Sequence, residues 1–380
     1  MSKKMLICAI GVQGSIGTTI AAGIETIKFS PNRVLDYLIT NRNDSALKGI
    51  YDEFEIAGWD LEGNSFFNSF IKNKPIKTET FNSVVKALEN KKIFTSPNFN
   101  QPIFNQVEQI RSNIQELKIT YKGYDLVAIN ILPASEINFD ECNVLSLQEI
   151  TKLSGKKYRD LAYLIACIKE GIPFINFTPN PIELEAIIKL AEENNTTLCG
   201  RDGKTGQTYF KVVLASAFKA RSLIVKGWYS TNILGNDDGK NLNDKKVATN
   251  KLRQKGVVLD RALGYHVQDH IVHIDYYSPR GDNKEANDII DFNGFLDEEM
   301  SMRVNVLCKD SVLAAPMIID MAVISAYLKY TLGKKGLLTE TSFFYKLPVG
   351  SEVENTTFES QLTILEKVIR CKGEYSNIKT

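Results

Sequence analysis

The sequence predicts an α/β protein that begins with a parallel sheet and continues into antiparallel strands. In its first half, short apolar runs alternate with helical stretches, which is the pattern of β-α-β units. From Ser222 the strands become longer and alternate apolar with polar residues, as in antiparallel sheets with one solvated face. Glycines between the first strand and the first helix mark a turn of the kind that can bind an anion.

The expected elements follow one another without an internal repeat or a low-complexity segment. We expect buried strands at residues 5–10, 34–40, 125–131, 173–177 and 196–199. We expect helices between them at residues 18–29, 158–170 and 182–193. The strands of antiparallel type are SLIVKGWYS, from Ser222, and HIVHIDYYS, from His270. The remaining expectations are a long apolar helix at 311–332 with an early proline, an amphipathic helix at 356–371 and a polar surface insertion at 72–101.

Composition indicates an ordinary globular protein. The 380 residues suggest two or three domains, and the 46 basic and 45 acidic side chains argue against a broad nucleic-acid or membrane surface. The six cysteines are scattered without a C-x-x-C pair, which predicts buried reduced thiols rather than disulfides or a zinc site. His270 and His273 lie on one expected strand and should point to opposite faces, which argues against a histidine metal site. With no signal peptide and no window of transmembrane length, we expect a cytoplasmic protein.

The stretch LICAIGVQGSIGTTIAAGI places Gly11, Gly14 and Gly17 between a strand and a helix. Glycines at such a point let a dinucleotide pyrophosphate approach the backbone and the helix N-terminus. The alternative is a tight turn that binds no ligand. An acid that binds the ribose usually follows such a loop by about 20 residues, which favours Asp36. Asp60, at the end of a further strand-like run, is the second candidate.

Several lysines lie where an anion could bind. Lys251 and Lys255 are one helical turn apart after a turn rich in Asn, Asp and Gly. In GRDGKTGQTYFK a strand ends and a helix opens, so the backbone amides from Thr205 to Thr208 could bind a phosphate. Lys346 stands inside an apolar run, where an unpaired ammonium would cost several kcal/mol, so we expect it to face a pocket.

These pieces, in this order, resemble the inositol-3-phosphate synthase (myo-inositol-1-phosphate synthase) family over most of the chain. The matching motifs are GVQGSIGTT, GWD, NFTPNP, GRDGKTGQT, STNILGNDDG, GDNK and KDSVLAAPMIID. The last two and GNDDG are specific to the family. The chain departs from the family pattern at Gln13, Ser15, Ile16, Thr231, Ile233, Asp237 and the LPASE that begins at Leu132. It is shorter than the eukaryotic enzymes and resembles the compact prokaryotic members.

The resemblance implies an active site of lysines beside a bound NAD. It assigns catalysis to Lys251, Lys255, Lys284, Lys346, Asp202 and Asp238. It assigns NAD binding to Gly11, Gly14, Ser15, Ile16, Gly17, Thr18, Asp60, Asn130, Asn176, Asp202, Asp310 and Ser311. It assigns the substrate phosphate to Thr205, Gly206, Gln207, Thr208, Asn236, Lys255 and Lys284. It also favours Asp60 over Asp36 as the ribose acid.

The reaction implied by the resemblance starts from D-glucose 6-phosphate. NAD oxidises C5, the product is enolised and closed by an intramolecular aldol step, and the same NADH reduces it to 1D-myo-inositol 3-phosphate. Fixed ammonium groups suit this chemistry because they stabilise an enolate and an alkoxide, and crowding lowers the pKa of a lysine toward acid–base use. Lys251 and Lys346 are assigned to proton transfer as a hypothesis, and Asp202, Asp238 and Asp310 to orienting lysines, nicotinamide or a cation. The need for a divalent metal ion or a monovalent cation stays open.

The resemblance also implies a Rossmann NAD-binding domain formed by residues 1–208 and completed by residues 314–380. An α+β catalytic domain at residues 209–313 is inserted, and its open sheet forms a homotetramer. The expected partners are a small-molecule sugar phosphate and further copies of the chain, with no nucleic acid and no membrane. Three alternatives stay open: an NAD-dependent dehydrogenase of another phosphorylated or carboxylated substrate, a cyclase that makes another cyclitol, and a catalytically silent sensor. The four lysines argue against the sensor, which would be expected to lose them.

Overall fold

The computed structural model describes residues 3–61, 68, 69, 84, 91–235, 258–350 and 357–370. The chain divides into two compact units. The first consists of Met1–Gly203, Ala314–Gly350 and Ile364–Thr380, and the second of Lys204–Leu313 and Ser351–Thr363. Relative to the expected boundaries, residues 204–208 and 351–363 fall in the second unit.

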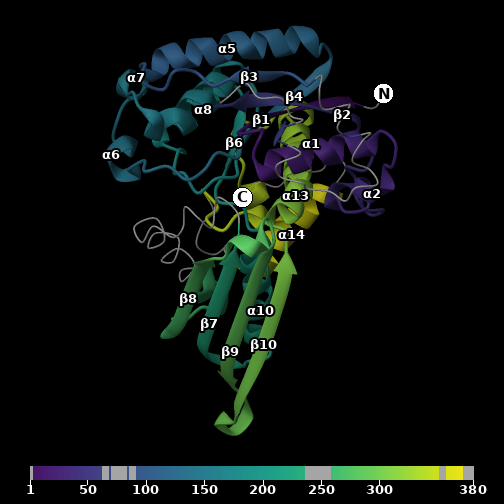
Figure 1. Cartoon of the computed structure of the whole chain (residues 1–380), viewed down its shortest axis with the longest axis vertical. Helices are drawn as coiled ribbons and strands as arrows, with labels where there is room; N and C mark the ends of the chain where they lie inside the picture. Colours follow the sequence, from purple (N-terminus) through teal and green to yellow (C-terminus); the bar gives the residue numbers. More distant parts are fainter. Residues whose placement is uncertain are drawn as a thin grey trace. The chain divides into compact units, whose positions relative to one another are not determined.

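The first unit is built on a seven-stranded parallel sheet with the order β11-β6-β5-β4-β1-β2-β3 (Figure 1). Its strands are β1 (Lys3–Ile10), β2 (Tyr51–Asp60), β3 (Ile93–Thr95), β4 (Tyr124–Asn130), β5 (Phe174–Asn176), β6 (Thr197–Gly200) and β11 (Gly336–Leu337). The chain winds outward from β1 on one side and from β4 on the other, which is the Rossmann order. Four of the five predicted strands are confirmed, and the C-terminal segment completes the sheet with β11 as expected.

The strand predicted at residues 34–40 is wrong. This segment forms the short helices α2 (Asn32–Leu35) and η1 (Ile39–Asn41). Asp320 holds η1 in place by accepting hydrogen bonds from the Thr40 amide at 2.9 Å and the Thr40 hydroxyl at 2.6 Å. A short apolar run does not distinguish a strand from a buried helical turn, which explains the error.

The insertion predicted at 72–101 is wrong in part, because β3 lies within it and pairs with β2. Residues 72–83 and 85–90 lie outside the described residues.

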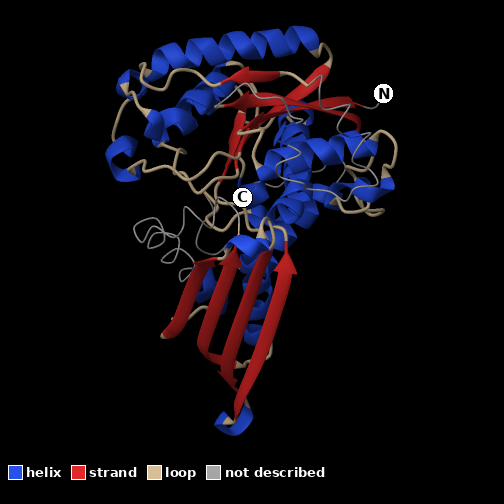
Figure 2. Cartoon of the chain, viewed as in Figure 1, coloured by secondary structure: helices blue, strands red, loops and turns tan. Residues whose placement is uncertain are grey.

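Helices lie on both faces of the parallel sheet (Figure 2). On one face they are α1 (Ser15–Ile27), α13 (Asp310–Ala326) and α14 (Phe358–Arg370). On the other they are α5 (Ile103–Thr120), α6 (Phe139–Asn143), α7 (Leu147–Lys152), α8 (Arg159–Lys169) and α9 (Glu185–Glu193). Met5 and Ile7 of β1 pack on the first face, and Leu6 and Cys8 pack on the second. Burial of both faces explains why β1 reads as one continuous apolar run.

The helix α13 is the long apolar helix expected from the sequence, and Pro316 lies inside it. With the π-helical turn η6 (Tyr327–Thr331) it is long and apolar enough to span a membrane, contrary to the expectation that no segment reaches that length. However, 78% of its most apolar window is buried inside the protein. The packing of α13 against the sheet therefore accounts for its composition, because a core helix meets the same length and hydropathy criteria.

The second unit contains a four-stranded sheet with the order β10-β9-β7-β8. Its strands are β7 (Ile224–Leu234), β8 (Asp269–Tyr276), β9 (Lys284–Asn293) and β10 (Glu299–Cys308). Strands β7, β9 and β10 pair antiparallel, but β8 runs parallel to β7. This corrects the prediction that β7 and β8 are both of antiparallel type. A parallel pair needs a long crossover, and the connection between these strands includes a helical stretch at residues 258–263.

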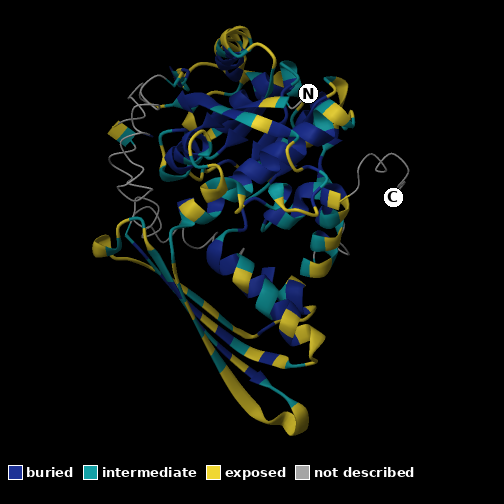
Figure 3. Ribbon diagram, turned by 90° about the vertical axis from the view of Figure 1, so that its right-hand side faces the viewer, coloured by how far each residue is buried: buried dark blue, intermediate teal, exposed yellow. Residues whose placement is uncertain are grey.

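One face of this second sheet is covered by α10 (Gly206–Ala220). The described residues on the other face, which we call the open face, are half-buried or exposed. Phe218 of α10 packs against Trp228 and Phe292 on the covered face. On the open face, Tyr229 and Ile271 are 40% and 45% exposed. Figure 3 shows the resulting alternation of buried and exposed residues along the strands.

The two histidines of β8 point to opposite faces, as predicted. His270 Nε2 lies 2.8 Å from Lys211 Nζ on the covered face, whereas the His273 ring lies against Tyr229 on the open face. In the described ranges no three His, Cys, Asp or Glu side chains gather into a group that could hold a metal ion.

The expectation of free thiols is confirmed for four buried cysteines (Cys8, Cys142, Cys167 and Cys199) and for the half-buried Cys308. Cys371 lies outside the described residues.

Candidate functional site

The glycine loop joins β1 to α1 at the point where the strand order reverses. Gly11 has φ +90°, and a Cβ at Gly17 would lie 2.2 Å from the Val12 carbonyl oxygen, so neither position accepts a side chain. Gly14 is the N-cap of α1, and Ser15–Thr18 form its first turn. This turn, described throughout, holds no acidic residue, and its leading amides have no partner within the helix. Such a helix start can bind a pyrophosphate.

Asp60 lies beside this loop at the end of β2. Its carboxylate accepts hydrogen bonds from the amides of Gln13, at 2.7 Å, and Leu61, at 2.8 Å. Asp36, which the spacing favoured, is instead the C-cap of the short helix α2. The usual spacing fails because α2 and η1 precede the second strand, which moves the end of that strand from the predicted 34–40 region to residue 60.

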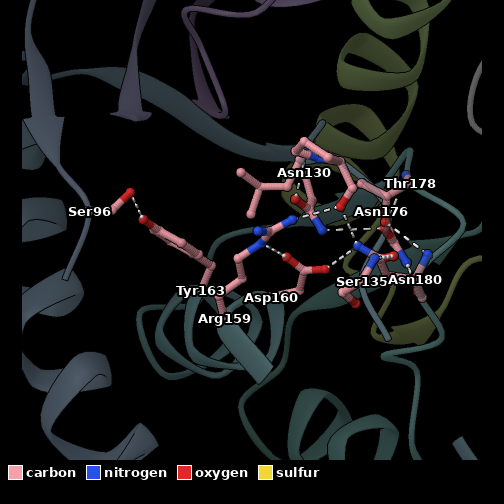
Figure 4. A network of polar contacts seen from close by, with 11 residues as sticks. Ser96, Asn130, Ser135, Arg159, Asp160, Tyr163, Asn176, Thr178 and Asn180 are labelled. Carbon is pink, nitrogen blue, oxygen red and sulfur yellow. Dashed lines mark hydrogen bonds and ion pairs between the residues drawn. The ribbon is translucent and has the colours of Figure 1, made fainter. Parts of the chain in front are cut away.

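Asn130 and Asn176 end the neighbouring strands β4 and β5 and lie together (Figure 4). Both are buried, and Asn130 Nδ2 lies 3.5 Å from Asn176 Oδ1. Asn176 also fixes the turn that follows it, accepting from the Thr178 hydroxyl at 2.7 Å and donating to the Asn180 carbonyl at 2.8 Å. The two amides therefore shape the carboxyl edge of the sheet, where Rossmann folds bind their ligands.

Asp160 anchors the other half of this network, and nothing in the sequence singles it out. Its carboxylate accepts from Asn180 Nδ2 and lies 3.6 Å from Arg159 Nε. Arg159 in turn donates to the Pro133 carbonyl at 2.8 Å, and Asn180 accepts from the Ser135 amide at 2.7 Å. Burial raises the pKa of Asp160 to about 6. These contacts fix the LPASE turn, which is one of the places where the chain departs from the family pattern.

Lys346 and Asp202 form an ion pair in the first unit. Lys346 Nζ lies 2.8 Å from Asp202 Oδ1, and the Lys346 amide donates to the Asp202 carbonyl at 2.8 Å. The Asp202 amide donates to the Thr178 carbonyl, which places the pair next to the Asn176 turn. The two side chains are 24% and 15% exposed. Lys346 is therefore half-buried and paired with a carboxylate. The pairing explains why a lysine is tolerated within an apolar run, because it offsets the cost of burying an ammonium.

In the second unit, Thr205 caps α10 and Gly206, Gln207 and Thr208 form its first turn. This turn is fully described and contains no acidic residue, so its leading amides are suited to an anion. Gly206 has φ +41°, and a Cβ there would lie 3.0 Å from Asp310 Oδ1. The side-chain amide of Gln207 donates to both oxygens of Asp288, each at 3.1 Å. A phosphate bound at the first turn of α10 could therefore contact the backbone amide of Gln207, whereas Nε2 of this residue is already bonded to Asp288.

Lys284 and Asn232 complete the described part of this region. Lys284 Nζ lies 3.1 Å from Asp310 Oδ2. The other oxygen of this carboxylate, Oδ1, lies next to Gly206. The neighbouring Ser311 donates to Asp282 at 3.0 Å. Asn232 is 1% exposed, and within the described ranges neither atom of its side-chain amide has a hydrogen-bond partner. Leaving a buried amide unsatisfied costs about 1–3 kcal/mol, which a polar ligand could offset.

Four of the assigned residues lie outside the described residues. They are Lys251, Lys255, Asn236 and Asp238. Their assignments to catalysis and phosphate binding stay predictions. Within the described ranges, the structure brings together Asp60 with the glycine loop, Asn130 with Asn176, Asp202 with Lys346, and Lys284 with Asp310.

Gly206→Ala should weaken the binding of inorganic phosphate about tenfold, as measured by isothermal titration calorimetry. The added Cβ would be strained at φ +41° and would press on Asp310, the partner of Lys284. Gly264→Ala is the matched control, because its φ of +85° gives similar strain while its Cβ meets only Lys219 Nζ at 3.6 Å. Equal phosphate affinity in both variants would contradict an anion site at the start of α10.

The chain is similar to inositol-3-phosphate synthases along nearly its whole length. A family model described as myo-inositol-1-phosphate synthase matches residues 206–311. Inositol-3-phosphate synthase 1 of Bacteroides thetaiotaomicron is 30% identical over 386 residues, which cover 91% of this chain and 90% of the relative. The chain belongs to the inositol-3-phosphate synthase family. It is therefore an enzyme of that class.

Other relatives and solved structures agree with this membership. The inositol-3-phosphate synthase of Brassica napus is 28% identical, covering 85% of this chain and 71% of the relative. The structure of the Caenorhabditis elegans inositol-3-phosphate synthase matches with a TM-score of 0.82 at 20% identity, over 97% of this chain and 86% of that chain. A myo-inositol-1-phosphate synthase-related protein of Thermotoga maritima matches with a TM-score of 0.76 at 19% identity, over 96% and 97%. These two structures confirm the family's fold for this chain.

Proposed function

We propose that this member of the family converts D-glucose 6-phosphate to 1D-myo-inositol 3-phosphate with a bound NAD that is not consumed. The proposal is supported above all by the burial and ion pairing of Lys284 and Lys346, the two assigned lysines that lie within the described residues. Lys284 and Lys346 are both half-buried, and each lies close to a carboxylate, at 3.1 Å and 2.8 Å. Positioned ammonium groups of this kind stabilise developing negative charge much better than solvated lysines do.

The first unit has features that fit NAD. The absence of a side chain at Gly17 and the positive φ of Gly11 would let a pyrophosphate reach the amides that open α1. Asp60, held against the loop by the Gln13 amide, would accept hydrogen bonds from ribose hydroxyls. When bound, NAD would supply the acceptor and donor of the C5 hydride.

The chain's own residues would bind the sugar phosphate and manage its protons. The amides that open α10, with Lys284 and the unsatisfied Asn232, would bind the phosphate. Lys346 would transfer protons and stabilise an oxyanion, and Asp202 would keep its ammonium in place. Lys251 and Lys255 would add positive charge from their assigned positions.

The accessory cation, the assembly and the location belong to the same proposal. Asp202, Asp238 and Asp310 are the carboxylates that would orient a divalent or monovalent cation, and activity with and without a chelator distinguishes these two cases.

The open face of the second sheet, with Tyr229 and Ile271 exposed, would join copies of the chain into a homotetramer. Sedimentation at micromolar concentration tests this assembly, and a monomer would contradict it. Microscopy of a tagged chain tests the cytoplasmic location.

Incubation of the protein with D-glucose 6-phosphate and NAD tests the proposed reaction. NMR should show 1D-myo-inositol 3-phosphate, and absorbance at the NADH band should show no net change. A dehydrogenase would accumulate NADH in proportion to the substrate, which contradicts the proposal. A different cyclitol phosphate in the NMR spectrum would support the alternative cyclase, and no product from any sugar phosphate would support the sensor.

A further inference from the structure

A buried polar network in the second unit has Asp288 of β9 at its centre. Asp288 is 6% exposed and accepts hydrogen bonds from three side chains on two other elements, α10 and β7. Gln207 Nε2 of α10 donates at 3.1 Å, Trp228 Nε1 of β7 at 2.8 Å, and the Ser230 hydroxyl also donates to it. Three donors converging on one buried side chain are the surroundings of an ionised carboxylate.

Lys211 of α10 balances this negative charge through Ser230. Its Nζ lies 3.0 Å from Ser230 Oγ, 2.8 Å from His270 Nε2 and 5.2 Å from the centre of the Trp228 ring. Burial lowers the pKa of Lys211 to about 8, so it is still mostly charged at pH 7. Because Ser230 donates to Asp288, its oxygen is left to accept from the ammonium. An ammonium can only donate, so His270 Nε2 is the acceptor in this contact.

We infer that Asp288 is a positioning residue for the substrate phosphate and acts through Gln207. Gln207 is the second residue of α10, so a bond to its side chain holds the turn whose backbone amides face the anion. A site that is ordered before binding loses less entropy when the ligand arrives. Lys211 is needed as well, because an unbalanced carboxylate near this turn would repel a phosphate. The inference rests on the proposed function for the identity of the substrate.

A purely structural network would give different results from a positioning one. If Asp288 only supported the fold, its loss would lower the melting temperature and leave the phosphate affinity of the folded protein unchanged. If Asp288 positions α10, the phosphate affinity falls in protein that is still folded, and KM for the sugar phosphate rises more than kcat falls. The affinity for NAD is unchanged in either case and serves as an internal control.

Asp288→Asn, with Asp291→Asn as the matched control, tests the inference. Asp291 is on the same strand, but it is exposed on the open face. Isothermal titration of the full-length protein with inorganic phosphate should show about tenfold weaker binding for D288N and wild-type binding for D291N. Wild-type affinity in D288N would overturn the inference, as would a wild-type protein that binds no phosphate.

Trp228→Phe keeps the test available if D288N does not fold. It removes the indole donor to Asp288 while keeping an aromatic ring under α10, and we expect a loss of phosphate affinity of a few fold. Unchanged affinity in a folded W228F would count against the inference.

Phosphate titration also separates this inference from the proposed function. If the protein makes no inositol phosphate but D288N binds phosphate more weakly than D291N, only the proposed function is contradicted. If the protein is a synthase but D288N and D291N bind phosphate equally, only the inference is contradicted.

Discussion

Lys346→Ala should lower kcat for inositol phosphate formation about a thousandfold while NAD binding is retained. The ammonium of Lys346 is fixed 2.8 Å from Asp202 at the carboxyl edge of the parallel sheet. Alanine at this position removes both a proton-transfer group and a positive charge, whereas the glycine loop and Asp60 would be left in place. Single-turnover kinetics with glucose 6-phosphate, together with fluorescence titration of NAD, would measure the two effects separately.

Lys335→Ala is the control for this variant. Lys335 is an exposed lysine of the same unit, so its loss changes the net charge equally without touching the Asp202 pair. We expect wild-type kcat in K335A. Wild-type turnover in K346A would refute the assignment of Lys346, and a loss of NAD binding in K346A would mean that the lysine acts on the cofactor site instead.

Gly17→Ala should weaken NAD binding by about tenfold to a hundredfold. A Cβ at this position would lie 2.2 Å from the carbonyl oxygen of Val12 and 2.6 Å from its carbonyl carbon. Both are backbone atoms of the loop, so the contact can be relieved only if α1 moves away from the loop. Since the pyrophosphate would be bound between these two elements, the displacement should act directly on NAD affinity, which calorimetry measures.

Gly23→Ala is the matched control in the same helix. Its Cβ would have ordinary van der Waals contact with Val34, at 3.9 Å, and alanine is the better helix former by about 1 kcal/mol. G23A should therefore bind NAD like the wild type and melt at the same or a higher temperature. If G17A also bound NAD like the wild type, the glycine loop would be a tight turn without a ligand.

Much of the first unit could be predicted from the sequence because its signals are local. The apolar run of β1, the glycines after it and the helices α8 and α9 can all be recognised within short windows. The errors arose where tertiary contacts decide the conformation. Asp320, far away in the sequence, holds residues 39 and 40 in a short helix where a strand was predicted. The parallel pairing of β8 depends on a crossover that no residue of β8 reveals.

The candidate site shows the same division. Spacing alone favoured Asp36 and left Asp60 as the second candidate. The family resemblance reversed this order, and the structure places Asp60 against the glycine loop. The networks around Asp160 and Asp288 join residues from three or more elements, so no spacing in the sequence could have indicated them. Burial and hydrogen-bond partners are properties of the folded chain, and they are what distinguishes these carboxylates from surface acids.

The proposed reaction both oxidises and reduces the same carbon of the substrate with one bound NAD. Glucose 6-phosphate carrying deuterium at C5 tests it most directly, with mass spectrometry of the product. The proposed reaction predicts that the deuterium is retained in the inositol phosphate, because the hydride that leaves C5 returns to the same carbon without mixing with free NADH. Product without deuterium, or deuterium found in released NADH, would contradict it.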